Sequence, residues 1–387
     1  MFSPQVADNT AQLSVVSQQT SRFQNTEKTY ATQLEPTSLI DAFLEHPPVG
    51  FGTFRLPSAR FSGKTQLPAF LTRYDLSLTA DGLPQWLKTV YQKFSVVAPF
   101  VQPLTLFVGT TVSEYCLLPA NQLNVSGLLQ HVKTLPQSKQ ADFIIFKDLP
   151  QASPLLNQAD EAVVQDLTKQ CQRQDWVLLE GQALAYVDVD FDSIDQYLSR
   201  LSYSRRKEFR RKLRSSSQLR IEEVRTGNAI FFDETFMSKF YSMYENVYQQ
   251  SETHFDKLSP SFFKKVLQTE SDNGIVFLYY RDDALIGWNL CFIQDNHLVD
   301  KYIGFQYPEA REANLYFVSW FHNLKFALEN RLTKYVAGWT DHNVKASLGA
   351  QFTMTRHAVY IRNPLLRAFL SQIKHVFECE LVNSKGV

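Results

Sequence analysis

Three residues suited to proton transfer lie close together in the segment SETHFDKLSP, between two predicted helices: Glu252, His254 and Asp256. An imidazole titrates near neutral pH, so His254 is a candidate proton acceptor, although an ordinary loop histidine fits the same pattern. The spacing of acid, histidine and acid also resembles a set of metal ligands. No fourth ligand of matching spacing accompanies it, so we predict no metal site here.

A second candidate pair lies on HLVDKYIGF, a predicted strand. Because side chains alternate along a strand, we expect Asp300, Tyr302 and Gly304 on one face. A carboxylate and a phenol on that face could exchange protons with a bound substrate. The alternative is structural, because a strand tyrosine usually packs in a core and Asp300 could pair with its neighbours.

Candidate anion contacts occur at two predicted helix starts. After the predicted strand TKYVAGW, Asp341 is suited to cap the helix that follows, and Lys345, one turn later, could contact an anionic ligand. Near the start of the long predicted helix ANLYFVSWFHNLKFALENR, Arg311 and Asn314 could contact a phosphate. Asn314 is equally suited to be a plain N-cap.

The strongest local charge signal is the predicted helix SIDQYLSRLSYSRRKEFRRKLRSSSQL, for which Asp192 or Ser193 is a suitable N-cap. Residues 200–225 include ten Lys or Arg residues and three acids. The cations from Arg205 to Arg214 wind around several faces, so they cannot all be buried. Their partners could be solvent and scattered acids, an anionic lipid surface, or a phosphate-rich ligand such as coenzyme A or a transfer RNA.

Composition bounds the remaining choices. The chain has 387 residues, 44% of them hydrophobic, which is enough for two domains with buried cores. Lys plus Arg and Asp plus Glu number 39 each, so no global charge requires nucleic acid or a membrane as a partner. Four scattered cysteines and a start without a secretory signal favour a reduced, cytoplasmic setting. Pro99, Pro103 and Glu114 interrupt the most apolar stretch, so we predict no integral membrane segment.

Helical and strand patterns alternate along the chain, which is typical of an α/β protein. We predict a disordered tail over residues 1–35, rich in Gln, Ser and Thr, and then a first domain over residues 36–191. A basic helix over residues 192–218 connects it to a second domain over residues 219–387. The predicted order in the second domain is strand, two helices, three antiparallel strands, helix, strand, helix, strand and a final helix.

This order of elements resembles the GNAT N-acetyltransferase fold. The connecting segment LSYSRRKEFRRKLRSSSQLRIEEV resembles the basic helix that precedes the second of two tandem GNAT-like domains in FemAB-like and BioF2-like acyltransferases. The strings LIGWNLCF, KYIGF and YVAGWTDHNVKASLGA also resemble that family's second domain. The resemblance implies an α/β fold with a mixed sheet, two tandem GNAT-like domains joined by the basic helix, and N-acyltransferase activity.

The resemblance also implies where the reaction takes place. In the family, the acyl thioester lies in a cleft between the third antiparallel strand and the next strand, here HLVDKYIGF and TKYVAGW. Asp300 would then deprotonate the acceptor ammonium, and Tyr302 would protonate the leaving thiolate. Asp341, a substrate-binding candidate, and Lys345, a donor-binding candidate, would face the mouth of the cleft.

The acceptor site implied by the resemblance lies in the loop described first. There His254 would be catalytic, and Glu252 and Asp256 would bind the substrate, an amine of a small molecule or of a peptidoglycan precursor. The amine would attack the acyl donor directly. No nucleophile elbow of the G-x-S-x-G type suggests a covalent intermediate.

One departure from the GNAT pattern leaves the donor open. GNAT enzymes bind the coenzyme A pyrophosphate with Gln or Arg, two residues, Gly, one residue and Gly or Ala at a helix start. Here the segment is GFQYPEAREANLYF, which keeps Gln306 but lacks the glycines. We expect no permanently bound cofactor, with acyl-CoA as the co-substrate. The alternatives are a Fem-type transferase that uses aminoacyl-tRNA on a cell-wall precursor or peptide, and a non-catalytic GNAT-like binding module.

Overall fold

The computed structural model describes residues 28–57, 65–74, 102–120, 123–251, 255–271 and 273–372. The strands of the first half are β1 (Gly52–Leu56), β2 (Leu67–Arg73), β3 (Leu104–Val108), β4 (Phe143–Pro150) and β5 (Val177–Asp188). Its helices are α1 (Thr37–Glu45), α4 (Val125–Thr134), α5 (Pro136–Gln140) and α6 (Gln158–Arg173). The connecting segment forms α7 (Ile194–Ser199), α8 (Tyr203–Leu213) and a 3-10 turn (Arg214–Gln218).

The strands of the second half are β6 (Arg220–Arg225), β7 (Gly274–Arg281), β8 (Ala284–Gln294), β9 (His297–Phe305), β10 (Lys334–Gly338) and β11 (Gln351–Ile361). Its helices are α9 (Glu234–Tyr248), α10 (Pro260–Gln268), α11 (Glu309–Glu312), α12 (Leu315–Glu329), α13 (His342–Leu348) and α14 (Pro364–Gln372), with a 3-10 turn over Ala229–Phe232. These elements follow the predicted order.

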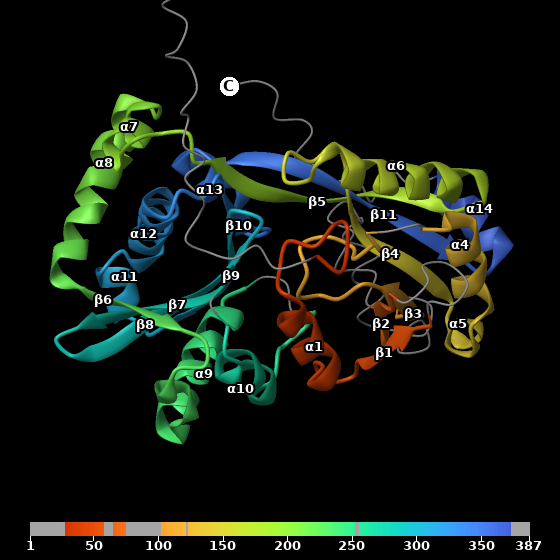
Figure 1. Cartoon of the computed structure of the whole chain (residues 1–387), viewed down its shortest axis with the longest axis horizontal. Helices are drawn as coiled ribbons and strands as arrows, with labels where there is room; N and C mark the ends of the chain where they lie inside the picture. Colours follow the sequence, from red (N-terminus) through yellow and green to blue (C-terminus); the bar gives the residue numbers. More distant parts are fainter. Residues whose placement is uncertain are drawn as a thin grey trace, which may run out of the picture.

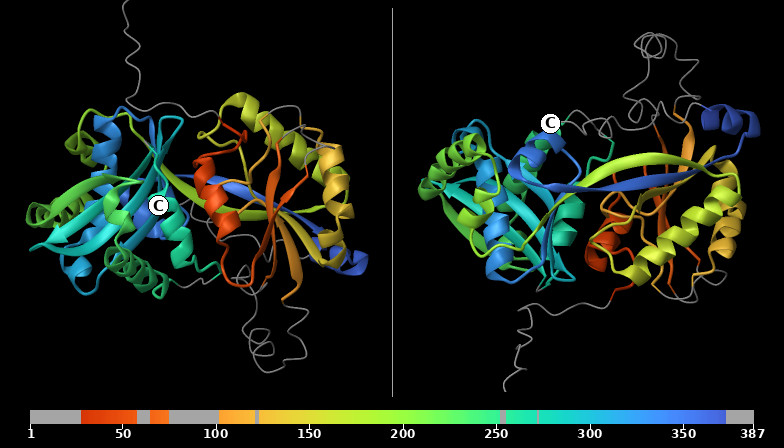
Figure 2. Two further views of the ribbon diagram at one scale, coloured as in Figure 1. Left: turned by 60° about the horizontal axis from the view of Figure 1, so that its bottom comes forward. Right: turned by 90° about the horizontal axis from the view of Figure 1, so that it is seen from above.

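The eleven strands of the described residues form one mixed sheet, in the order β1-β2-β3-β4-β11-β5-β10-β9-β8-β7-β6 (Figure 1). The last strand, β11, pairs with β4 and β5 of the first half, while β5 also pairs with β10 of the second half. The long ribbons of β5 and β11 therefore run from one half into the other (Figure 2). The sheet does not break at the predicted domain boundaries, which stay a prediction.

The three-stranded meander of the second half is confirmed. Strands β7, β8 and β9 are antiparallel neighbours. The predicted turns between them are two-residue connections, Asp282-Asp283 and Asp295-Asn296, whose residues all have positive φ. Asp and Asn tolerate this conformation better than most residues, which is why they mark hairpin turns in a sequence.

The predicted single helix over residues 192–218 is interrupted. Ser193 caps α7 by accepting a hydrogen bond from the backbone N–H of Gln196, as predicted. A second serine, Ser202, caps α8 in the same way through Arg205, so the chain restarts its helix there. In α8 the buried side chain is Phe209, which packs against the rings of Phe317 and Phe321 on α12.

The predicted tail ends earlier than expected. Residues 1–27 lie outside the described structure, but residues 30–35 are buried. Thr32 bonds the backbone of Cys116 and Leu118, and Tyr30 forms a bridge with Pro119. The polar composition of this segment suggested a tail because its partners are more than eighty residues away along the chain.

Gly304 of β9 shows how closely the meander packs. Trp288 lies opposite it on β8, stacked on Phe240 at 3.7 Å and donating its Nε1–H to the Phe240 carbonyl at 2.9 Å. A Cβ at Gly304 would lie 2.3 Å from the Trp288 ring, so the alanine variant must displace an anchored indole.

We therefore expect Gly304→Ala to lower the free energy of unfolding by about 1–3 kcal/mol. Urea denaturation of this variant and of Gly52→Ala provides the measurement. A Cβ at Gly52 would have only Leu71 O, at 3.8 Å, within 4 Å, so that variant should unfold close to wild type. Equal midpoints for wild type and Gly304→Ala would contradict this packing.

Candidate functional site

The candidate site lies where β9 and β10 separate. The two strands pair in parallel only from Lys334↔His297 to Val336↔Val299. At Gly338, which has a φ of 79°, β10 is already paired with β5 after an irregularity in register. A Cβ at Gly338 would lie 3.8 Å from the Lys345 Nζ and 3.9 Å from the Asp300 carbonyl oxygen. The Lys345 ammonium thus reaches the point of separation.

Lys345 is a buried cation without a neutralising partner. It lies on α13 and is 5% exposed, yet its ammonium makes no hydrogen bond or ion pair with any residue in the described part of the chain. Burial lowers the pKa of Lys345 to about 8, and the charges of Asp300, Asp341 and Glu114 oppose this shift. Such an ammonium is suited to stabilise a negative charge that develops on a bound substrate.

Asp300 lies on the same side of β9 and holds three elements together. Its carboxylate accepts hydrogen bonds from Asn289 of β8 at 2.6 Å, Asn323 of α12 at 3.1 Å and Tyr335 of β10 at 2.8 Å. Burial raises the pKa of Asp300, whereas these donors and the Lys345 charge lower it. The geometry fits a residue that positions its neighbours and attracts the Lys345 ammonium.

Tyr302 does not share a face with Asp300, so that expectation was wrong. Leu290 lies opposite Tyr302 and Cys291 opposite Asp300, which leaves Lys301 as the extra residue of a β-bulge. The bulge shifts the alternation of side chains. Tyr302 therefore packs against Phe262 and Phe263 of α10, with ring centroids 6.1 and 5.6 Å away.

The other side of the bulge holds a buried charge cluster that sequence reasoning missed. The Lys301 ammonium contacts Glu35 at 3.2 Å and also Glu114, with the three side chains 5%, 0% and 2% exposed. Burial raises the pKa of Glu35 to about 7, and the Lys301 charge opposes this shift. Glu114 had a sequence signal, because it is an acid within the most apolar stretch; Glu35 had none, because it was assigned to the tail.

The predicted acceptor loop is partly described. Glu252 and His254 lie outside the described residues, so their roles stay predictions. Burial raises the pKa of Asp256, while the charges of Lys147 and Lys301 oppose it. Asp256 therefore faces the cluster around Lys301 and not the Lys345 side of the sheet.

The residues predicted to bind the acyl donor make contacts with other residues of the protein. Arg311 donates to Gln250 at 2.9 Å and lies over the Tyr307 ring, and Gln306 donates to the Tyr307 carbonyl at 3.4 Å. Asn314 and Asp341 are both left-handed residues at helix starts, and neither side chain makes a capping hydrogen bond.

Two acids occupy the short helix before α12. Glu309 and Glu312 lie in the first turn of α11, where a GNAT enzyme would present backbone N–H groups to a pyrophosphate. Glu312 pairs with Arg281 at 3.1 Å, the negative charge of Glu309 opposes a second anion, and the glycines that allow close approach are absent. The residues present therefore do not fit the pyrophosphate of coenzyme A at this position.

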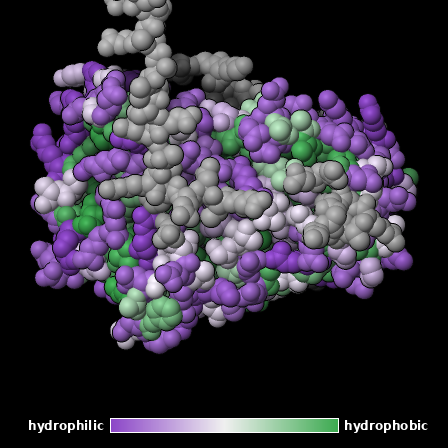
Figure 3. All heavy atoms as spheres, viewed as in Figure 1, coloured by the Kyte–Doolittle hydropathy of each residue, from purple (hydrophilic) through white to green (hydrophobic). Residues whose placement is uncertain are grey.

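The basic helix presents a continuous cationic stripe. Lys207 and Arg211 share one face of α8 with exposed Tyr203, and Arg214 follows at the start of the 3-10 turn. All three cations are exposed and make no ion pair with any other described residue. In contrast, Arg210 pairs with Asp195 at 3.0 Å and Lys212 with Glu208 at 2.7 Å. Hydrophilic side chains cover much of this edge of the molecule (Figure 3).

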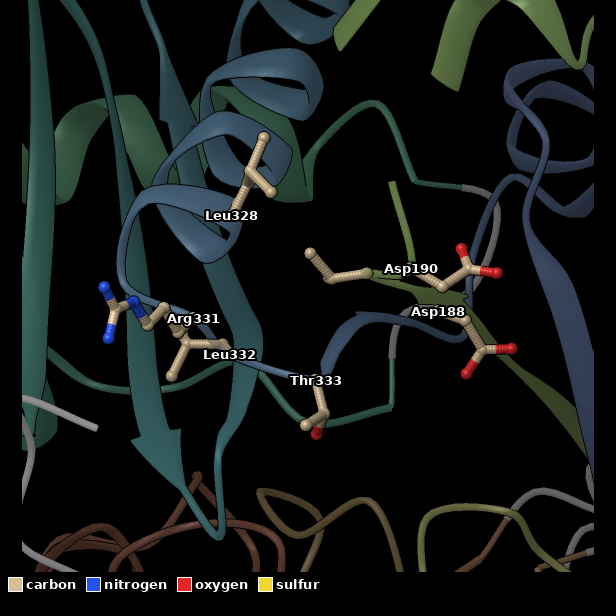
Figure 4. A pocket seen from close by; sticks show the side chains of 7 residues that line it. Asp188, Asp190, Leu328, Arg331, Leu332 and Thr333 are labelled. Carbon is tan, nitrogen blue, oxygen red and sulfur yellow. The ribbon is translucent and has the colours of Figure 1, made fainter. Parts of the chain in front are cut away.

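A surface cavity of about 520 Å³ lies at the far end of β10 from Gly338 (Figure 4). Its two carboxylates already have partners, since Asp188 accepts hydrogen bonds from Lys334 and Gln351 and Asp190 pairs with Arg200. The cavity thus adds no reactive group to the site. Over the described ranges there is neither a cluster of three metal-ligating side chains nor a helix suited to span a membrane.

Comparisons with known proteins agree with this architecture. The FemAB-like family, described as peptidoglycan biosynthesis/recognition, matches residues 156–381, more than half of the chain. The fold is similar to the C-terminal domain of a putative lysylphosphatidylglycerol synthetase from Agrobacterium fabrum, with a TM-score of 0.50, 10% identity, and coverage of 88% of this chain and 95% of that chain.

Two further solved structures are similar. L-PGS from Bacillus licheniformis has a TM-score of 0.50, 8% identity, and coverage of 91% of this chain and 98% of that chain. FemX has a TM-score of 0.49, 12% identity, and coverage of 91% and 96%. No curated protein matches the chain. At these identities the structural likeness concerns the fold.

Proposed function

The chain belongs to the FemAB-like family, and from this premise we propose that it transfers an aminoacyl group from a transfer RNA to an amine of a cell-wall precursor. The observation that carries the proposal is Lys345, buried at the separation of β9 and β10 and unpaired within the described part of the chain. No ion pair within the described residues explains why this cation is buried, so Lys345 is a candidate for contact with the substrate.

In the proposed reaction, a neutral amine attacks the ester carbonyl of the aminoacyl-tRNA. The carbonyl oxygen gains negative charge in the tetrahedral adduct, and the Lys345 ammonium stabilises it. Asp300 keeps Asn289, Asn323 and Tyr335 in place and favours the protonated form of Lys345. The adduct then collapses, and the bond between the carbonyl carbon and the ribose oxygen breaks.

Two features favour transfer RNA over acyl-CoA as the donor. Glu309 and Glu312 occupy the place where a pyrophosphate would bind, which disfavours the acyl-CoA reaction expected from the GNAT resemblance. The stripe of Lys207, Arg211 and Arg214 offers three unpaired cations to a phosphate backbone. A lipid acceptor is the second candidate, because one protein of similar fold is named a putative lysylphosphatidylglycerol synthetase.

A donor panel tests this proposal. We expect aminoacyl-tRNA to raise the melting temperature of the protein, because a ligand that binds only the folded state at 100 times its Kd stabilises it by about 2.7 kcal/mol. Acetyl-CoA and longer acyl-CoAs should leave the melting temperature unchanged. Uncharged transfer RNA is the matched control, and labelled aminoacyl groups should appear on a lysine-containing peptidoglycan stem peptide. Stabilisation by acyl-CoA alone would overturn the transfer RNA donor.

A further inference from the structure

The cluster of Glu35, Lys301 and Glu114 carries an excess negative charge in the interior. Lys301 contacts one oxygen of each carboxylate, and the backbone N–H of Glu114 donates to Glu35 Oε1 at 2.6 Å. The second oxygen of each carboxylate, Oε2, is buried and has no hydrogen-bond partner among the residues that the structure describes. A buried ion cluster built for stability would satisfy both oxygens, because an unpaired buried acceptor is costly.

The cluster joins segments that are distant along the chain. Glu35 precedes α1, Glu114 follows β3, and Lys301 is the bulge residue of β9, so one ammonium links the first half to the second. The central strands bring these segments together in the middle of the molecule (Figure 1). The bulge turns Lys301 away from the side of the sheet on which Asp300 lies.

The charges that act on the cluster come from several elements. Lys147 of β4 and Lys345 of α13 are both attracted by Glu114, and Asp256 and Tyr302 lie on the same side of the sheet. The Glu114 carboxylate therefore lies within electrostatic range of the Lys345 ammonium, which is assigned to the reacting carbonyl.

The two oxygens without donors, Glu35 Oε2 and Glu114 Oε2, indicate which kind of ligand could bind here. Each is an acceptor without a donor, and an alkylammonium offers three N–H donors and the positive charge that the cluster lacks. A divalent metal such as Ca²⁺ or Mg²⁺ needs about six oxygen ligands, more than the two free oxygens supply, which disfavours it. An amine cation is therefore the ligand that fits both the hydrogen-bonding capacity and the charge.

We propose that Glu35 and Glu114 bind the ammonium of the acceptor substrate and that Glu35 Oε2 takes a proton from it before attack. This inference rests on the proposed function and names the acceptor half of the same site. Lys301 is a positioning residue that holds both carboxylates. Because both are enclosed, binding of the amine requires the packing around them to open.

The proton balance of the step is complete. One N–H bond of the ammonium breaks and an O–H bond forms on Glu35, which leaves the nitrogen lone pair free to form the C–N bond. A second proton passes from the tetrahedral adduct to the ribose oxygen as the C–O bond breaks. Glu35 then returns its proton to solvent, so the net release is one proton per transfer.

We expect Glu35→Gln to lower kcat/KM for a lysine-containing stem peptide by about 100-fold, the scale of general-base catalysis, with the KM for aminoacyl-tRNA unchanged. Burial raises the pKa of Glu35 to about 7, so wild-type kcat/KM should rise with pH through this value. The rise should disappear in Glu35→Gln. Glu114→Gln should keep the rise and increase the acceptor KM about 10-fold.

Three comparisons make the outcome decisive. Glu45→Gln, an exposed residue of α1, is the matched control and should behave as wild type. Glu35→Asp keeps a carboxylate and should keep the pH dependence, which separates loss of the base from loss of folding. Wild-type kinetics retained in Glu35→Gln would overturn this acceptor site while leaving the proposed function intact. Absence of transfer in the wild type, despite folded protein, would instead overturn the proposed function.

Discussion

Replacing Lys345 with methionine is expected to lower the rate constant of aminoacyl transfer by about 10²–10³-fold, the usual cost of losing one donor to a developing oxyanion. Methionine keeps most of the volume of the lysine stem but removes the charge. The donor should still bind, because the α8 stripe is untouched. Single-turnover transfer from labelled aminoacyl-tRNA measures the effect, and Lys325→Met, at an exposed position of α12, is the control.

The pH dependence provides an independent signature of the same residue. Burial lowers the pKa of Lys345 to about 8, so the wild-type rate should fall as pH rises through this value. With the rise expected from Glu35 near pH 7, the wild-type profile should be a narrow bell. An alkaline limb that persists in Lys345→Met would contradict the assignment of that limb to Lys345.

Lys345→Met should fold stably. The difference in unfolding free energy between wild type and this variant should depend on pH, with a sign that follows from proton linkage. The folded-state pKa of Lys345, about 8, lies below the usual lysine value of 10.5, so the unfolded chain binds more protons between these values. Wild-type stability should therefore rise across this window, by roughly 3 kcal/mol, relative to Lys345→Met. Urea denaturation at pH 7.5 and pH 10 measures the difference. Loss of the cooperative urea transition in Lys345→Met would contradict this account of the buried charge.

Removing the cationic stripe is expected to weaken donor binding without changing the chemical step. For the triple variant Lys207→Ser, Arg211→Ser and Arg214→Ser, we expect Kd for aminoacyl-tRNA to rise about 10- to 100-fold at low salt. The slope of log Kd against log salt concentration should fall by about three, one for each lost phosphate contact. Filter binding over a range of salt concentrations measures both quantities.

A matched triple variant separates local contacts from net charge. Lys139, Lys169 and Arg173 are exposed on α5 and α6, at the opposite end of the molecule from α8 (Figure 1). Their replacement with serine changes the net charge equally and should leave the salt slope close to wild type. Equal losses in the two triple variants would show that α8 is not a specific contact surface.

Short-range features of this protein were readable from its sequence. The predicted order of elements included the meander of β7, β8 and β9, and Ser193, one of two candidate N-caps, caps α7. The long helix predicted over ANLYFVSWFHNLKFALENR is α12. These signals depend on residues within a few positions of one another, where turn geometry, capping and helical periodicity act.

The residues of the candidate site depended on long-range structure. The sequence placed Lys345 near a strand-to-helix turn, but its position follows from how β10 separates from β9 after Val336 while it stays paired with β5. The alternation rule failed at Lys301 because a bulge inserts one residue, and no local pattern marks it. Only tertiary structure could join Glu35, Glu114 and Lys301, since burial and the pairing of charges are set by segments that meet after the sheet has formed.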